Sequence, residues 1–168
     1  MRVDKILENR MYIWNINQLV DDLKSNQVTQ TQFKNYYLVS ITFVLLNYLL
    51  MSQLEIMDLK IQAATTLIEF GLLITWVNIL FKTNGGEQGQ QFLNRIAALS
   101  LPIGIRVTVA MVFIWVFFEF LIRGYKTEVS AEQVILIESY ITAASEISIS
   151  FVFYWRMYVA MARVNAAS

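Results

Sequence analysis

The sequence predicts an all-α membrane protein, a four-transmembrane-helix bundle with an N-terminal amphipathic cytoplasmic helix. Three observations lead to this fold class. Hydrophobic residues make up 57% of the 168-residue chain and charged residues only 15%, whereas soluble domains carry about 25% charged residues. Several apolar stretches reach the length of about 20 residues that an α-helix needs to cross a bilayer. Helix-capping spacings and short polar turns separate these stretches.

Residues 1–28 form a separate segment before the bundle. We expect an amphipathic helix over Arg2–Lys24, because Val3, Ile6 and Leu7 begin an apolar pattern with helical spacing. Charged residues cover its other side, so the segment is too polar to cross a membrane. Two arrangements stay open. The helix lies in the headgroup plane, or it packs on a partner chain or on its own bundle.

Residues 29–168 contain four stretches that we expect to cross the membrane. They are Tyr37–Leu54, Ile61–Phe81, Leu99–Ile122 and Val134–Tyr158. The spacings Thr29–Gln32 and Ser130–Gln133 are those of a capping box, which predicts helix starts just before the first and fourth stretches. We interpret the Gly-rich segment 83–89 as a flexible turn, since it lacks the Gly-Lys-Ser/Thr of a phosphate loop.

The basic residues predict the orientation of the bundle. Cytoplasmic loops of membrane proteins carry an excess of lysine and arginine. With the N-terminus inside, the cytoplasmic side takes Arg2, Lys5, Arg10, Lys24, Lys34, Lys82, Arg95, Arg156 and Arg163, and the outer side takes Lys60, Arg123 and Lys126. We therefore expect a multi-pass protein with both termini in the cytoplasm, in a bacterial inner membrane.

Three ionisable residues lie deep in the apolar stretches: Glu69, Arg106 and Glu146. An arginine at the centre of a span costs roughly 2.5–3.5 kcal/mol on insertion scales, so Arg106 needs an anionic partner. One interpretation is a buried ion pair or triad that holds the bundle in register, and another is an ion or proton pathway. In a third, Arg106 extends to the cytoplasmic interface. The sequence does not decide whether Arg106 pairs with Glu69, Glu146 or neither.

Two further patterns concern helix packing. A polar stripe follows one face of the fourth stretch and consists of Ser139, Thr142, Glu146 and Ser150. A seam of small residues spaced by four, which lets another helix approach closely, consists of Ser100, Gly104 and Thr108. Together they offer more packing surface than one four-helix bundle must bury. We therefore expect homo-oligomerisation or a stable complex.

Composition excludes several classes of function. The chain has no cysteine and no histidine, which removes disulfides, thiol or histidine catalysis, and the usual zinc and haem ligands. A net charge of zero gives no global field for nucleic acid. The predicted spans hold no carboxylate pair at helical spacing for acid–base chemistry. We therefore expect no enzyme, no cofactor, no metal and no nucleic acid.

Two functions remain. We favour a non-enzymatic integral membrane subunit that oligomerises in the lipid bilayer and recruits or regulates a soluble cytoplasmic protein. Small bacterial multi-span proteins without catalytic motifs form the membrane parts of two-component anti-phage modules, Kiwa being one such arrangement. This analogy of architecture extends the expectation to an anti-phage or stress-response module. The alternative is a small oligomeric ion or proton channel or transporter that uses Glu69, Arg106 and Glu146.

Overall fold

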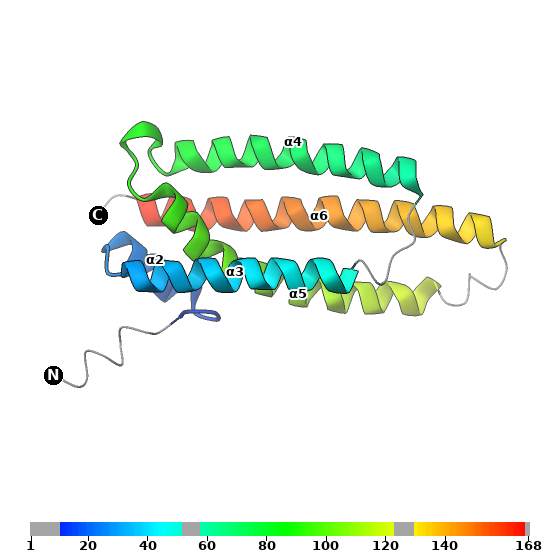
Figure 1. The fold of residues 1–168 in the computed structure, drawn as a ribbon, viewed down its shortest axis with the longest axis horizontal. Helices are drawn as coiled ribbons and strands as arrows, with labels where there is room; N and C mark the ends of the chain where they lie inside the picture. The colour runs from blue at the N-terminus through cyan, green and yellow to red at the C-terminus, as the bar shows by residue number, and fades with distance from the viewer. Residues whose placement is uncertain (1–10, 52–57, 123–129, 167–168) are drawn as a thin grey trace.

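The structure, a computed structural model, describes residues 11–51, 58–122 and 130–166. Within these ranges the chain forms five α-helices, one 3-10 turn and no strand (Figure 1). The elements are α2 (Ile16–Lys24), α3 (Gln30–Met51), α4 (Leu59–Thr83), η1 (Gly86–Gln88), α5 (Phe92–Ile122) and α6 (Ala131–Asn165). The predicted all-α class is confirmed. Residues 52–54, which end the first predicted span, lie outside the described ranges.

Capping boxes set the amino ends of α3 and α6. The backbone N–H of Thr29 donates to Oε1 of Gln32 at 2.7 Å, and the N–H of Gln32 donates to Oγ1 of Thr29 at 3.3 Å. Ser130 and Gln133 exchange the same two bonds at 3.2 and 3.4 Å. These side chains satisfy amide groups that a helix start leaves without backbone partners. The predicted starts of both helices are confirmed.

The four long helices lie side by side in the order α4, α6, α5, α3. Helix α6 packs against α4 and α5, and the main contact of α3 is with α5. Helices α3 and α5 run in one direction, and α4 and α6 run in the other (Figure 1). Helices α3 and α4 follow each other in the chain but lie at opposite edges of this row, so the arrangement is open.

Aromatic rings hold α4 against α6. Trp76 of α4 is only 8% exposed. Its ring stacks on Tyr154 with centroids 6.2 Å apart, and it meets the edge of Phe151 at 5.6 Å. Such pairs contribute about 0.5–1.5 kcal/mol beyond the burial of their area. This cluster fixes the rotation of α4 about its axis.

Much of the apolar surface of the long helices faces outward. Exposed large apolar side chains include Leu38, Val44, Leu45, Leu67, Phe70, Phe113, Phe117 and Val152. A contiguous surface of this kind is rare on soluble monomers. Three helical segments in the described ranges are long and apolar enough to cross a membrane, Leu59–Thr83, Phe92–Phe118 and Gln133–Asn165. These segments indicate a membrane-embedded protein.

The amino-terminal helix is shorter than the apolar pattern predicts. Residues 11–15 are not helical, and the side chain of Asn15 caps α2 by accepting the N–H of Gln18 at 3.2 Å. The predicted continuous helix through 11–15 is therefore wrong, while residues 2–10 lie outside the described ranges. The apolar face of α2 is buried against α5 and α6. Of the two open arrangements, α2 takes the one in which it packs on its own bundle.

Candidate functional site

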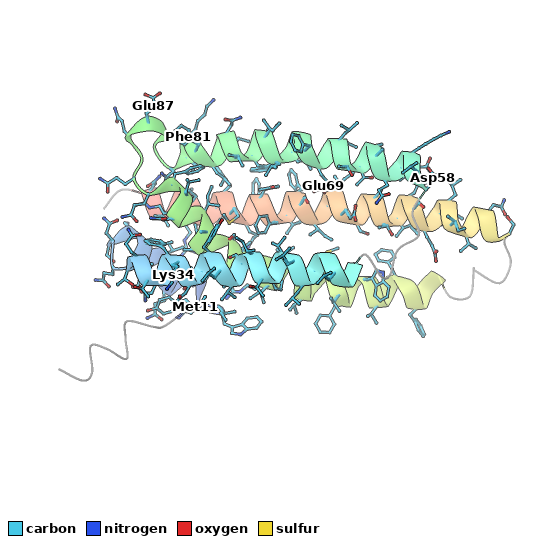
Figure 2. The ribbon with its side chains drawn as sticks, in the orientation of Figure 1. Met11, Lys34, Asp58, Glu69, Phe81 and Glu87 are labelled. Atoms are coloured by element: carbon cyan, nitrogen blue, oxygen red, sulfur yellow. The ribbon has the colours of Figure 1, made fainter. Side chains whose placement is uncertain are left out.

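Several segments that are far apart in the sequence meet at one end of the molecule. They are α2, residues 83–95 and the last turn of α6, and we refer to them together as the polar end (Figure 1). Met11 and Glu87 lie at this end, and Asp58 lies at the opposite end (Figure 2). The basic residues Lys24, Lys82, Arg95 and Arg163 belong to the polar end or border on it. The bundle therefore has one end rich in hydrogen-bonding and basic groups.

Arg95 connects three helices at the polar end. Its side chain is only 7% exposed. Its Nη1 donates to Oδ1 of Asn84 at 3.0 Å and to Oδ1 of Asn165 at 2.9 Å. Asn84 directly follows α4 and Asn165 is the last residue of α6. Because the carboxyl end of a helix carries partial negative charge, the two helix ends stabilise the buried guanidinium between them.

The two asparagines extend this network to the backbone. The amide of Asn165 donates to the carbonyl of Thr83 at 2.6 Å, and the amide of Asn84 donates to the carbonyl of Gln90 at 3.2 Å. Asn84 is 1% exposed. Each asparagine thus accepts a bond from Arg95 and donates one to another segment. These bonds hold the turn after α4 in a defined conformation, whereas the sequence predicts a flexible turn there.

Glycines allow the turn to close over the network. Gly85 has φ +99° and Gly86 has φ +60°, in the left-handed region that favours glycine. A Cβ added to Gly89 would lie 2.1 Å from the carbonyl oxygen of Asn84, so only glycine fits there. The turn, Arg95 and Asn165 surround an open cavity of about 500 Å³. The polar end therefore presents a shaped surface rather than a loose connection.

Glu69, one of the predicted intramembrane charges, contacts the polar stripe. It lies about midway along the bundle, on the side of α4 that faces α6 (Figure 2). Its Oε2 accepts the hydroxyl of Ser150 at 2.8 Å. Its Oε1 is buried and has no hydrogen-bond partner within residues 11–51, 58–122 and 130–166. The centre of the α4–α6 interface thus holds a carboxyl group that is half satisfied.

The polar stripe of α6 also contacts α4 near its start. Ser139, 1% exposed, accepts the backbone N–H of Asp58 at 3.0 Å and donates to the carbonyl of Ile135 at 2.7 Å. Thr142 and Glu146 lie between Ser139 and Ser150 and are partly buried. The stripe therefore follows the interface with α4 inside a single chain.

Arg106 reaches toward the polar end. Its Nη2 donates to the backbone carbonyl of Trp14, in the non-helical segment before α2. Trp14 itself is 65% exposed. The structure thus gives Arg106 and Glu69 separate hydrogen-bond partners, and a pairing of Arg106 with Glu69 or Glu146 stays a prediction. The geometry matches the interpretation in which Arg106 extends along its helix to an interface.

The small-residue seam of α5 is in contact with helices of the same chain. Oγ of Ser100 lies 3.4 Å from Oγ of Ser40 in α3. A Cβ added to Gly104 would lie 3.7 Å from Phe43 of α3 and 3.8 Å from Phe153 of α6. The seam therefore lets α3 and α6 approach α5. Its use between copies of the chain stays a prediction.

The sequence patterns did not identify the Arg95 network. The sequence predicts Arg95 only as one of the cytoplasmic basic residues and assigns no site role to Asn84 or Asn165. One local signal was present, since an arginine a few residues after a Gly-rich turn has backbone carbonyls and amides within reach. No local signal identifies Asn165, which is 70 positions from Arg95.

The helices of the described ranges, three of them long and apolar enough to cross a membrane, define the class to which this chain belongs, a small all-helical, membrane-embedded protein. Within the described ranges no group of three His, Cys, Asp or Glu residues is placed to hold a metal ion. No protein-family model, curated protein or solved structure matches the chain. The function is therefore inferred from its own residues and contacts.

Proposed function

We propose that this protein is a non-enzymatic integral membrane subunit that oligomerises and binds a soluble cytoplasmic protein at its polar end. The Arg95 network carries the proposal, because it joins the ends of α4, α5 and α6 through one buried and one partly buried hydrogen bond. Helix α2 packs beside them on α5 and α6. A surface held in one conformation loses less conformational entropy when it binds a partner.

The proposal includes four crossings of the membrane. Helix α3 has 22 residues and is about 33 Å long at 1.5 Å per residue, against about 30 Å for the hydrocarbon core. It runs in the same direction as α5 and packs along it, so a bilayer around α5 also surrounds α3. Its outward side chains include Leu38, Val44, Leu45 and Leu49. Four crossings place both termini on one side, and the basic residues favour the cytoplasm of a bacterial inner membrane.

Site-directed labelling tests this orientation. The chain has no cysteine, so single cysteines introduced at the exposed positions Ser25, Lys60 and Glu87 report without background. An impermeant thiol reagent should label only Lys60→Cys in intact cells and all three variants in lysed cells. Labelling of Ser25→Cys or Glu87→Cys in intact cells would reverse the orientation.

Co-purification tests the partner. In mild detergent, the wild-type chain should retain a soluble protein, and the mass of the complex should exceed that of one chain plus the partner. Glu87→Lys, on the exposed turn, should release the partner without changing the melting temperature. Lys60→Glu, at the opposite end, is the matched control and should retain it. A wild-type chain that stays a monomer without a partner, even after cross-linking in cells, would refute the proposal.

The proposed setting is an anti-phage or stress-response module. It rests on the analogy of architecture. Cells with and without the gene, challenged with phage and with envelope stress, should differ in survival. The Glu87→Lys variant should behave like the deletion if the partner acts through the polar end.

A second candidate function is a small oligomeric ion or proton channel or transporter. The buried Oε1 of Glu69 favours it, because a carboxyl oxygen at the middle of a bundle that has no donor among the described residues can bind a transported ion. In liposomes, flux carried by the wild-type protein should disappear in Glu69→Gln while the mass of the assembly stays the same. Absence of flux for the wild-type protein would refute this candidate.

A further inference from the structure

A groove runs between α3 and α5 next to the polar end. Its volume is about 810 Å³, within the roughly 300–1,000 Å³ typical of ligand sites. Helix α3 lines it from Gln30 to Leu45, and α5 lines it from Leu93 to Ser100. Lys34, Tyr37 and Ile41 are exposed, so the groove opens to the surroundings of the bundle.

The lining of the groove changes in character along its length. Near the starts of both helices it carries the polar side chains of Gln30, Lys34 and Asn94 beside the apolar ones of Phe33 and Leu93. Farther along α3 the walls become aliphatic, with Ile41, Val44 and Leu45, while the small residues Ser40, Ala97 and Ser100 leave space along it. Figure 2 shows Lys34 on the part of α3 nearer the polar end. The groove thus passes from a mouth of mixed character, which holds its polar and charged side chains, to a mainly aliphatic interior.

The mouth of the groove carries groups that attract an anion. Lys34 is the one charged side chain among the described residues that line it. Helices α3 and α5 run in the same direction and begin at Gln30 and Phe92, so both amino ends lie at the mouth. A helix amino end carries about half a positive charge and offers backbone N–H groups to phosphate. One ammonium group and two helix amino ends therefore favour an anion there.

We propose that this groove binds one anionic phospholipid, with its phosphate at Lys34 and the amino ends of α3 and α5. An acyl chain then lies along Ile41, Val44 and Leu45. The order of cation, tyrosine and aliphatic residues along α3 is that of headgroup, interface and hydrocarbon layers. A soluble phosphate compound would leave the aliphatic half unused.

Lipid binding in the groove is separate from partner binding at the polar end. The only requirement that the two share is that α3 crosses the membrane. The cysteine labelling described above tests the orientation separately. A lipid held at this place would lie at the interface beside the polar end. It would occupy the groove between the two helices and stabilise their packing.

The test compares lipids on the purified protein in neutral detergent. Phosphatidylglycerol and phosphatidylcholine with the same acyl chains are added, and retention is measured by native mass spectrometry beside melting temperature. Phosphatidylglycerol should bind about fivefold more tightly, the factor expected for one lysine near an anionic surface. Lys34→Gln should remove this preference, and Lys82→Gln, at the end of α4, should keep it. Glycerol 3-phosphate, the headgroup phosphate without acyl chains, should not raise the melting temperature.

A second variant tests the apolar part of the groove. Ala97→Phe should fill its interior and lower retention of both lipids, whereas Leu67→Phe, on the exposed side of α4, should not. Equal binding of both lipids, an unchanged preference in Lys34→Gln, or binding of glycerol 3-phosphate as tight as that of the lipid would overturn the proposal. Disulfide-linked dimers of Ile41→Cys in membranes would show that a second copy covers the groove and would overturn it too.

Discussion

Ser150 of α6 donates its hydroxyl to Oε2 of Glu69 in α4 at 2.8 Å, and the other oxygen of this carboxyl group is buried without a partner among the described residues. Removing the one donor leaves the whole carboxyl group unsatisfied. We expect Ser150→Ala to lower the free energy of unfolding by about 1–2 kcal/mol, in the range for hydrogen bonds inside bundles and to charged groups. The measurement is thermal melting in detergent.

Ser148→Ala is the matched control for this change. Its hydroxyl donates to the carbonyl of Ala144 in its own helix, at 2.7 Å, on an exposed face. A double-mutant cycle of Ser150→Ala with Glu69→Gln should give a coupling energy, because each change removes one side of the same contact. Equal effects of Ser148→Ala and Ser150→Ala would contradict the assigned contact.

Arg95 should be the most sensitive side chain of the polar end. Arg95→Met keeps much of the volume but removes both bonds, so the buried Asn84 and the exposed Asn165 each lose a donor. We expect a loss of about 2–4 kcal/mol. Arg95→Lys should recover little, because a single ammonium lacks the planar geometry that joins two acceptors. Arg156→Met, on an exposed face of α6, should change the melting temperature little.

The turn after α4 gives a steric prediction. In Gly89→Ala the new methyl group would overlap the carbonyl oxygen of Asn84, which is backbone and cannot rotate away. The turn must move, and the Arg95 network should weaken with it, so we expect a loss of more than 1 kcal/mol. Gly71→Ala is the control: nothing lies within 4 Å of the added Cβ, and alanine in a helix interior is about 0.5–1 kcal/mol more favourable than glycine. A Gly89→Ala protein that melts like wild type would refute the described turn.

The features that the sequence predicts correctly are local ones. The starts of α3 and α6 follow from capping boxes, whose donors and acceptors are three residues apart. The apolar pattern predicts too long an amino-terminal helix, because the pattern continues through residues 11–15, which are not helical. Asn15, the residue that ends this segment and caps α2, resembles any other polar residue in such a pattern.

The contacts that could not be predicted depend on how helices rotate and where they end. The sequence predicts an anionic partner for Arg106, whereas the contacts in the structure are with the backbone carbonyl of Trp14 for Arg106 and with the hydroxyl of Ser150 for Glu69. Which partner each one meets depends on the face that α4 turns to α6 and on the course of the chain near Trp14. The Arg95 network requires the ends of α4 and α6 to meet beside the start of α5. No spacing within one helix encodes such a meeting point.

Two substitutions of Gly104 test how closely α5 packs against α3 and α6. The added Cβ of Gly104→Ala would meet Phe43 and Phe153 at 3.7 and 3.8 Å, which is ordinary contact distance, so this variant should fold normally. Gly104→Leu places further atoms between α5 and both neighbours, and overpacking of this kind costs typically 1–3 kcal/mol. Melting curves of the two variants provide the measurement. A Leu variant as stable as the Ala variant would contradict the close approach of the three helices.

The buried Tyr36 makes the stability of the bundle depend on pH in the alkaline range. It lies one residue before the first predicted span and is 1% exposed, and its hydroxyl oxygen accepts the backbone N–H of Tyr12 at 2.6 Å. Burial raises the pKa of Tyr36 from 10.0 to about 12. Between these two values the unfolded chain has lost its phenol proton while the folded chain still holds it. Since the unfolded state then binds fewer protons, the stability that Tyr36 contributes is complete below pH 10 and falls as the pH rises toward 12.

Tyr36→Phe isolates this contribution from other groups that titrate in the same range. The variant should be about 1 kcal/mol less stable at pH 8, because the N–H of Tyr12 loses its acceptor. The difference between wild type and variant should then shrink above pH 10 and reverse before pH 12, because a rise of two pKa units outweighs a single hydrogen bond. Tyr37→Phe, at a position that is 55% exposed, should show no such trend. A difference between wild type and Tyr36→Phe that stays constant up to pH 12 would mean that Tyr36 is not buried as a neutral phenol.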